Sequence, residues 1–227
     1  AYLNSPEAQH DRDAGCDFQV EEGMSLAEVV KRVKPTILLG LSGVGGIFTK
    51  EVIANMTEAL APSRQRPVVF ALSNPTDKTE CTPEQAYEWS NGQVIYAAGS
   101  PFPPVIKDGV EVLLPAQGNN IFIYPGVGLG VTATKATGVT DEMFYEASKA
   151  LAASVPGESL MQGRLFPDIN SIRQVSHKVA CAVAKKAREQ GLATEDLPPF
   201  KDSWEQYIRD LMWTPEYQPL IMSQKLM

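Results

Sequence analysis

The chain has 227 residues, a formal net charge of −7 and a pI near 5.0. Hydrophobic residues make up 44% and charged residues 21%, which is ordinary for a globular protein and excludes a disordered or fibrous class. The acidic balance, with no basic stripe, excludes a nucleic-acid partner, because that affinity comes largely from clustered Lys and Arg. No stretch reaches the ~20 apolar residues that a bilayer crossing requires, so we expect no membrane partner.

The three cysteines, Cys16, Cys81 and Cys181, are far apart and lack metal-ligand spacing. They predict neither a disulfide framework nor a zinc site, and we expect a soluble protein of a reducing compartment such as cytosol, chloroplast stroma or mitochondrial matrix. The chain starts at Ala1 and continues as a polar stretch with no element before it. We therefore expect it to be part of a longer protein.

Apolar runs alternate with helical patterns in the first half of the chain. Each apolar run ends in a turn of small or polar residues, and the helical patterns carry capping residues, as in Thr82-Pro83 followed by Gln85. This alternation predicts a doubly wound α/β unit. Its expected strands are residues 36–41, 67–73 and 94–98, and its expected helices are residues 25–33, 49–60 and 82–90.

After Pro104 the alternation stops. A turn at residues 107–109 indicates a hairpin, and two later patterns predict helices at residues 140–155 and 170–190. From Leu192 the chain is rich in proline and aromatic residues, and we expect an extended tail that packs on another surface. The predicted domains are residues 1–118, 119–197 and 198–227.

The carboxyl ends of the predicted strands are candidate binding sites, because ligands of open α/β sheets bind there. The glycine turn at residues 42–46 permits close backbone approach, but it departs from the full dinucleotide fingerprint, and Ser73-Asn74 stands where a ribose-binding acid is expected after the next strand. A plain tight turn is an equally good interpretation. A second glycine-rich stretch, residues 126–130, is better explained by helix packing.

Asparagines offer the other candidate contacts. Asn74, before Pro75, and the pair Asn119-Asn120 can each be ordinary turn residues, or amides that hold a substrate carboxylate or a nicotinamide ribose. Neither His10 nor His177 has a catalytic setting in the pattern. The acidic residues fall mostly in helix caps and on exposed faces, without a cluster for a divalent cation. These residues alone predict a nucleotide-binding α/β module of unassigned activity.

Several motifs, in order and at matching spacing, strongly resemble malic enzymes. The resemblance extends over nearly the whole chain from about residue 34 to residue 217. The motifs that carry it are KPT (34–36), GLSGVGGIFT (40–49), FALSNPT (70–76), ECTPEQAY (80–87), GSPFPPV (99–105), QGNN (117–120), GRLFP (163–167) and IRQVS (172–176).

The resemblance implies a partial doubly wound, Rossmann-like parallel sheet followed by a helical layer. It also implies oxidative decarboxylation of L-malate to pyruvate and CO2, with reduction of NADP or NAD and with Mg²⁺ or Mn²⁺. The form of the 42–46 turn favours NADP. By resemblance, Asn74, Asn119 and Asn120 contact the substrate, while Ser42, Gly43 and Asn74 contact the cofactor.

The family's catalytic residues and metal ligands have no match in this chain and are expected upstream of residue 1. The resemblance thus implies three partners: malate or pyruvate, the missing N-terminal part of the same enzyme, and further copies in a dimer or tetramer. We predict that the chain alone is inactive. Two alternatives remain open, a non-catalytic binding or regulatory module and another nicotinamide-dependent enzyme such as an amino-acid dehydrogenase.

Overall fold

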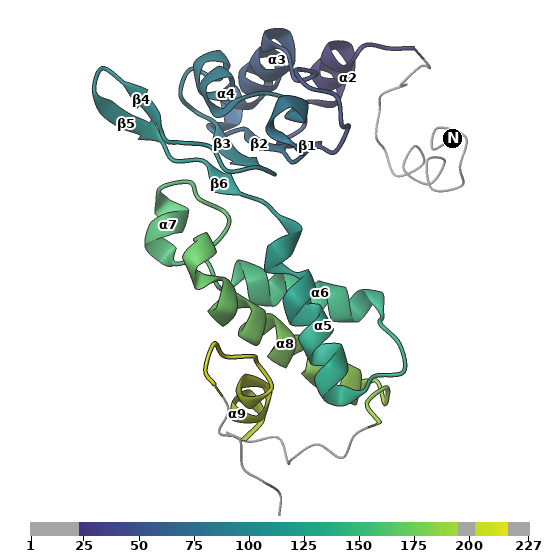
Figure 1. Cartoon of the computed structure of the whole chain (residues 1–227). Coiled ribbons are helices and arrows are strands. Elements are labelled where there is room, and N and C mark those ends of the chain that lie inside the picture. The colour runs from purple at the N-terminus through teal and green to yellow at the C-terminus, as the bar shows by residue number, and fades with distance from the viewer. Residues whose placement is uncertain (1–22, 195–202, 218–227) are drawn as a thin grey trace, which may run out of the picture. The chain divides into compact units, whose positions relative to one another are not determined.

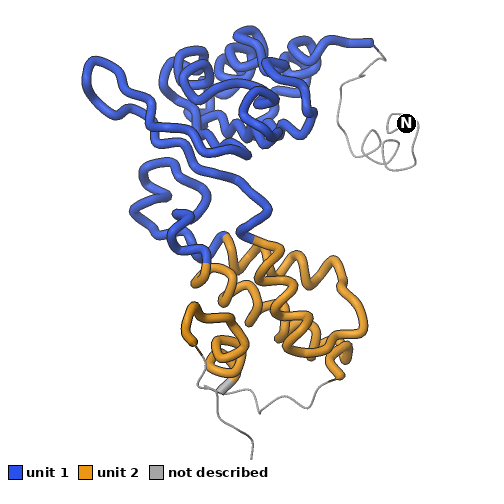
Figure 2. Tube along the Cα trace, in the orientation of Figure 1, with its two compact units in different colours: residues 1–122, 152–172 blue, residues 123–151, 173–227 orange. Residues whose placement is uncertain are grey.

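The computed structural model describes residues 23–194 and 203–217. These residues pack as two compact units, shown in Figure 2. Unit 1 comprises the described parts of residues 1–122 and 152–172, and unit 2 comprises the described parts of residues 123–151 and 173–227. The predicted domain boundaries at residues 118 and 197 separate segments by their expected roles rather than by packing. They therefore stay predictions. His10, Cys16 and the polar start of the chain lie outside the described residues.

Unit 1 is built on a parallel sheet with strand order β1-β2-β3-β6 (Figure 1). The first three strands confirm those expected from the apolar runs. The fourth was not predicted because it is too short to give a sequence pattern. The strands are β1 (Ile37–Gly40), β2 (Val68–Ala71), β3 (Ile95–Ala98) and β6 (Ala116–Gln117).

The three helices expected between the strands are present. Ser25 and Thr49 cap the first two by accepting a backbone N–H, and Thr82 with Gln85 forms a complete capping box on the third. These caps fix where each helix starts and therefore where the preceding turn ends. The helices are α2 (Leu26–Val33), α3 (Lys50–Leu60) and α4 (Pro83–Trp89).

The core of unit 1 lies between these helices and one face of the sheet. Ile53 and Met56 of α3 and Val69 of β2 are fully buried within it. On the opposite face Phe70 packs against Phe166, with ring centroids 5.6 Å apart. β1 is an edge strand of the described sheet, and its Ile37 and Leu39 are 54% and 57% exposed.

The rest of unit 1 consists of short elements. The expected hairpin is confirmed, and Asp108 and Gly109 at its turn both have positive φ. Its strands are β4 (Val105–Lys107) and β5 (Val110–Leu113). The other elements are α7 (Gly157–Met161) and the single 3-10 turns η2 (Ala61–Ser63), η3 (Thr76–Lys78), η4 (Asn120–Phe122) and η5 (Ile169–Ser171).

Unit 2 is helical. The extended tail expected from Leu192 is wrong for one segment, because the last helix of the unit buries Trp204 and Ile208 against Ala133 and Ala180. The prolines on both sides of this segment led to that error, because they obscured a helix of only eight residues. None of the helices in the described ranges is long and apolar enough to cross a membrane. The helices are α5 (Tyr124–Thr134), α6 (Asp141–Ala152), α8 (Ile172–Glu189) and α9 (Ser203–Asp210).

The glycines of residues 126–130 serve helix packing, as predicted. A Cβ on Gly126 would lie 2.6 Å from the Cβ of Val179, and one on Gly130 would lie 2.8 Å from the carbonyl oxygen of Ala180. α5 therefore approaches α8 at a distance that only glycine permits.

Candidate cofactor and substrate site

Hydrogen bonds join the turns at the carboxyl ends of the four parallel strands. The Gly43 N–H donates to the Ser73 hydroxyl at 2.9 Å, linking the turns after β1 and β2. The Ser100 hydroxyl donates to the Asn74 side-chain oxygen at 2.6 Å, linking the turns after β2 and β3. Asn119, after β6, donates to the Gly99 carbonyl at 3.1 Å. The predicted site residues thus line one continuous edge of the sheet.

The glycine turn at residues 42–46 is open toward solvent and tight on its inner side. Gly43 and Gly46 have φ of +67° and +73°, a region that favours glycine. A Cβ on Gly45 would lie 2.5 Å from the Asp77 carbonyl oxygen, so this glycine packs directly on the backbone of η3. The whole turn is exposed, and its backbone is accessible to a ligand.

Asn74 lies exposed at this edge, next to Gly99, where no side chain fits. A Cβ on Gly99 would lie 2.7 Å from the Asn74 amide nitrogen and closer still to the Leu72 carbonyl oxygen. The Asn74 oxygen is occupied by Ser100, whereas its amide nitrogen donates to Leu72 only at 3.4 Å. The amide nitrogen is therefore the part of Asn74 best able to donate to a bound molecule.

The two adjacent asparagines differ in what they bind. The Asn119 side chain donates to the Gly99 carbonyl and accepts the Ile121 N–H at 3.0 Å, so both ends of its amide hold the local fold. Asn120 is exposed at the start of η4, and its side chain makes no hydrogen bond to another described residue. Asn120 is thus better placed than Asn119 to contact a ligand directly.

A buried carboxylate lies directly beneath this edge and was not predicted. Glu80 is fully buried, although the sequence indicated caps and exposed faces for the acidic residues. It accepts the Ser42 N–H at 3.0 Å, the Ser42 hydroxyl at 2.9 Å and the Ser73 N–H at 3.3 Å, and a short hydrogen bond from the Ser73 hydroxyl. Its position in the ECTPEQAY motif was the only sequence signal, because its donors are distant in the sequence.

The environment of Glu80 keeps it ionised. Burial by itself raises the pKa of this carboxyl, but the hydrogen bonds from Ser73 and Ser42 outweigh burial and leave the pKa below its ordinary value of 4.5. Folding thus favours the charged form. The stabilisation is complete above the unfolded pKa and is lost as the pH falls through the folded pKa.

We expect acid to destabilise unit 1 partly through Glu80. The free energy of unfolding, measured by urea denaturation at a series of pH values below 4.5, should fall less steeply with decreasing pH in Glu80→Gln than in the unsubstituted chain. Glu84→Gln, an exposed carboxyl on α4, is the matched control and should keep the original slope. Equal slopes in all three proteins would contradict the assignment of an ionised Glu80.

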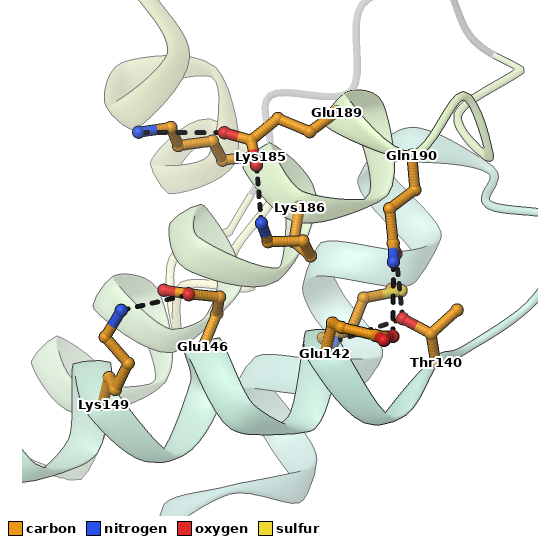
Figure 3. A network of polar contacts seen from close by, with 9 residues as sticks. Thr140, Glu142, Glu146, Lys149, Lys185, Lys186, Glu189 and Gln190 are labelled. Atoms are coloured by element: carbon orange, nitrogen blue, oxygen red, sulfur yellow. Dashed lines mark hydrogen bonds and ion pairs between the residues drawn. The ribbon is translucent and has the colours of Figure 1, made fainter.

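A second polar cluster lies in unit 2, between α6 and α8 (Figure 3). Thr140 and Glu142 both contact Gln190, and Lys149 pairs with Glu146 at 3.0 Å. Lys186 pairs with Glu189 at 2.7 Å, and that hydrogen bond raises the pKa of the lysine. Each of these ion pairs joins residues of one helix, whereas the hydrogen bonds of Gln190 link the start of α6 to the end of α8, so the cluster is a surface network of paired charges.

His177 and Cys181 lie one helical turn apart on α8 in unit 2, with Cys181 Sγ 3.8 Å from His177 Nε2. The His177 ring is 5% exposed, and its Nε2 lies 2.7 Å from the backbone oxygen of Glu205. The ring is therefore packed rather than solvated, and it joins α8 to α9. Burial raises the pKa of the Cys181 thiol to about 11, so this cysteine is a poor nucleophile. Cys81 and Cys181 are both free thiols.

The family model for the malic enzyme NAD-binding domain matches residues 4–188. The chain belongs to the malic enzyme family. The match runs past residue 118 and includes the whole edge of the sheet described above. It supports the α/β fold with a Rossmann-like parallel sheet that the motifs implied.

Named relatives come from both cofactor classes. The chain is 47% identical over 194 residues to the NADP-dependent malic enzyme, chloroplastic, of Zea mays, covering 86% of this chain and 29% of that one. It is 46% identical over 198 residues to the NAD-dependent malic enzyme of Aliivibrio fischeri (strain MJ11), covering 87% and 34%. This chain therefore spans about a third of the length of these relatives.

A solved malic enzyme has a similar fold. The crystal structure from Entamoeba histolytica superposes with a TM-score of 0.61 at 27% identity, over 82% of this chain and 32% of that one. The agreement thus extends over most of this chain but only part of the crystallised enzyme.

Proposed function

We propose that this chain supplies the later part of the dinucleotide site of a malic enzyme, which oxidises L-malate and decarboxylates the product to pyruvate and CO2. The observation that carries the proposal is the single edge on which hydrogen bonds link the turns that contain Gly43, Asn74 and Asn119. The family match supports a bound NAD(P), and the relatives' names leave NADP and NAD both open.

The residues of this edge fit a dinucleotide. The open backbone at Ser42 and Gly43 allows the cofactor to approach closely, and the Asn74 amide nitrogen can donate to the nicotinamide ribose or to malate. Asn119 holds the turn after β6, so that Asn120 can reach a substrate carboxylate. When bound, the dinucleotide accepts a hydride from the C2 carbon of malate.

The described residues do not fit a divalent metal site. Within residues 23–194 and 203–217, no three His, Cys, Asp or Glu side chains gather where they could hold a metal ion. Glu80, the carboxylate beneath the candidate site, is buried and already accepts hydrogen bonds from Ser42 and Ser73. We therefore place the ligands for Mg²⁺ or Mn²⁺, and the catalytic acid and base, in other parts of the enzyme.

The rest of the enzyme is needed to complete the site. The greater length of the relatives and the place of β1 at the edge of the sheet both support a sheet that continues into another segment of the enzyme. We also propose a homo-oligomer in a reducing compartment, consistent with the free thiols of Cys81 and Cys181.

The test is a malate assay on two proteins, the full-length protein as its source cell makes it and the 227-residue chain alone. With Mn²⁺ present, we expect malate-dependent formation of NADPH or NADH by the full-length protein, its loss on adding a chelator, and no turnover by the chain alone. Turnover by the chain alone would contradict the incomplete site.

Two further measurements on the full-length protein, amino-acid oxidation and dinucleotide binding, separate the two alternative functions. Oxidation of amino acids in place of malate would identify a different nicotinamide-dependent enzyme. Binding of NADP or NAD without turnover of either substrate class would identify a binding or regulatory module.

A further inference from the structure

Glu80 holds the exposed 42–46 turn from both of its ends. At the start of the turn, its carboxylate accepts the N–H and the hydroxyl of Ser42 at 3.0 and 2.9 Å. Just beyond the other end, its backbone carbonyl accepts the Phe48 N–H at 3.0 Å. The neighbouring Thr79 carbonyl accepts the Gly46 N–H, also at 3.0 Å. Hydrogen bonds to residues 79–80 therefore hold both ends of the turn.

The same carboxylate also fixes the end of β2. Ser73 donates its hydroxyl and its N–H to Glu80, and the Ser73 hydroxyl accepts the Gly43 N–H at 2.9 Å. A direct link at Ser42 and an indirect link at Gly43 thus converge on one carboxylate. Asn74, the residue after Ser73, is held from its other side by Ser100.

The fold makes room for this buried charge. A Cβ on Gly40, at the end of β1, would lie 2.5 Å from the Glu80 carboxyl carbon. Among the described residues, no Lys, Arg or His forms a salt bridge with Glu80, so hydrogen bonds alone compensate its burial. Burying a carboxylate destabilises the fold unless hydrogen bonds compensate for the lost hydration. An uncharged side chain would fill the same space without that penalty, so the charge of Glu80 indicates a role beyond packing.

We propose that Glu80 is the positioning residue of the cofactor site. It sets the backbone of residues 42–46 for the dinucleotide and controls dinucleotide affinity without touching the ligand. This inference rests on the proposed function. The Asn74 side chain is oriented by Ser100 rather than by Glu80. Loss of the Glu80 carboxylate should therefore weaken binding of the cofactor more than binding of malate.

The experiment compares Glu80→Gln with Glu84→Gln in the full-length protein. The carboxamide keeps one acceptor oxygen but replaces the other by an NH2 donor and removes the charge, so the hydrogen bonds that hold the turn are weakened. We expect the KM for the preferred dinucleotide to rise about tenfold or more, because hydrogen bonds to a charged group are lost. The KM for malate should change by less than about twofold. Glu84→Gln should leave both constants unchanged.

A second variant protects the test against a folding failure of Glu80→Gln, checked by circular dichroism. Gly40→Ala keeps the carboxylate but forces it out of its place, so the same selective rise in the dinucleotide KM is expected. Gly40 does not have positive φ, so its backbone accepts alanine.

Each outcome has a separate meaning. An unsubstituted full-length protein that neither binds NADP or NAD nor turns over malate overturns the proposed function, and the role of Glu80 with it. A normal unsubstituted protein whose variants keep the original dinucleotide KM overturns the role of Glu80 alone. An equal rise in both KM values indicates a general structural role and also overturns it.

Discussion

Replacing Gly126 by alanine should destabilise unit 2 by about 2 kcal/mol, whereas the same replacement at Gly128 should stabilise it by about 0.5–1 kcal/mol. Both residues lie inside α5, so alanine gains the same helix propensity at each. At Gly126 the new methyl would lie 2.6 Å from the Cβ of Val179, while at Gly128 nothing lies within 4 Å. The difference in sign therefore measures the close packing of α5 on α8.

Urea denaturation followed by far-ultraviolet circular dichroism measures both changes. Gly130→Ala extends the series, and it should destabilise somewhat less than Gly126→Ala because its closest contact is 2.8 Å. A stabilising Gly126→Ala would contradict the packing of these helices.

Asn74→Asp should reduce kcat/KM of the full-length enzyme for malate by about a hundredfold or more. The amide nitrogen, the donor best able to reach a ligand, is replaced by an oxygen, so a hydrogen bond to a charged group worth ~1.5–3 kcal/mol is lost. The new negative charge also repels the carboxylates of malate, which adds to the loss. Asn74→Ala, which adds no charge, should reduce kcat/KM less than Asn74→Asp.

The matched control is Asn91→Asp. Asn91 is an exposed turn residue with φ of +52°, a conformation that aspartate also tolerates. Steady-state kinetics on the three variants should show the loss only at position 74. Unchanged kinetics in Asn74→Asp would remove Asn74 from the site.

Much of the fold could be predicted because its signals are local. Apolar runs located β1, β2 and β3, and Thr82 with Gln85 located the start of α4. β6 was missed because its register depends on pairing with β3, with Ala97 opposite Ala116, and its own sequence is too short to show this. α9 was missed because its stability comes from packing on α5 and α8.

The candidate site was predictable in position but not in detail. Parallel strands bring their carboxyl ends to one edge, so Ser42 and Asn74 could be placed together from the sequence. Asn119 follows β6, which was not predicted, and only the resemblance assigned it to the site. The different tasks of Asn119 and Asn120 depend on single hydrogen bonds to Gly99 and Ile121, which no sequence pattern encodes. For the same reason Glu80 could not be separated from the exposed acidic residues.

Hydrogen exchange on the full-length protein, with and without a saturating dinucleotide, tests the central claim most directly. We expect the dinucleotide to slow amide exchange in residues 42–46 and 73–76, the turns joined through Ser73, and to leave residues 141–152 of α6 unchanged. Protection confined to unit 2, or no protection at either turn, would contradict the placement of the cofactor at the carboxyl edge of the sheet.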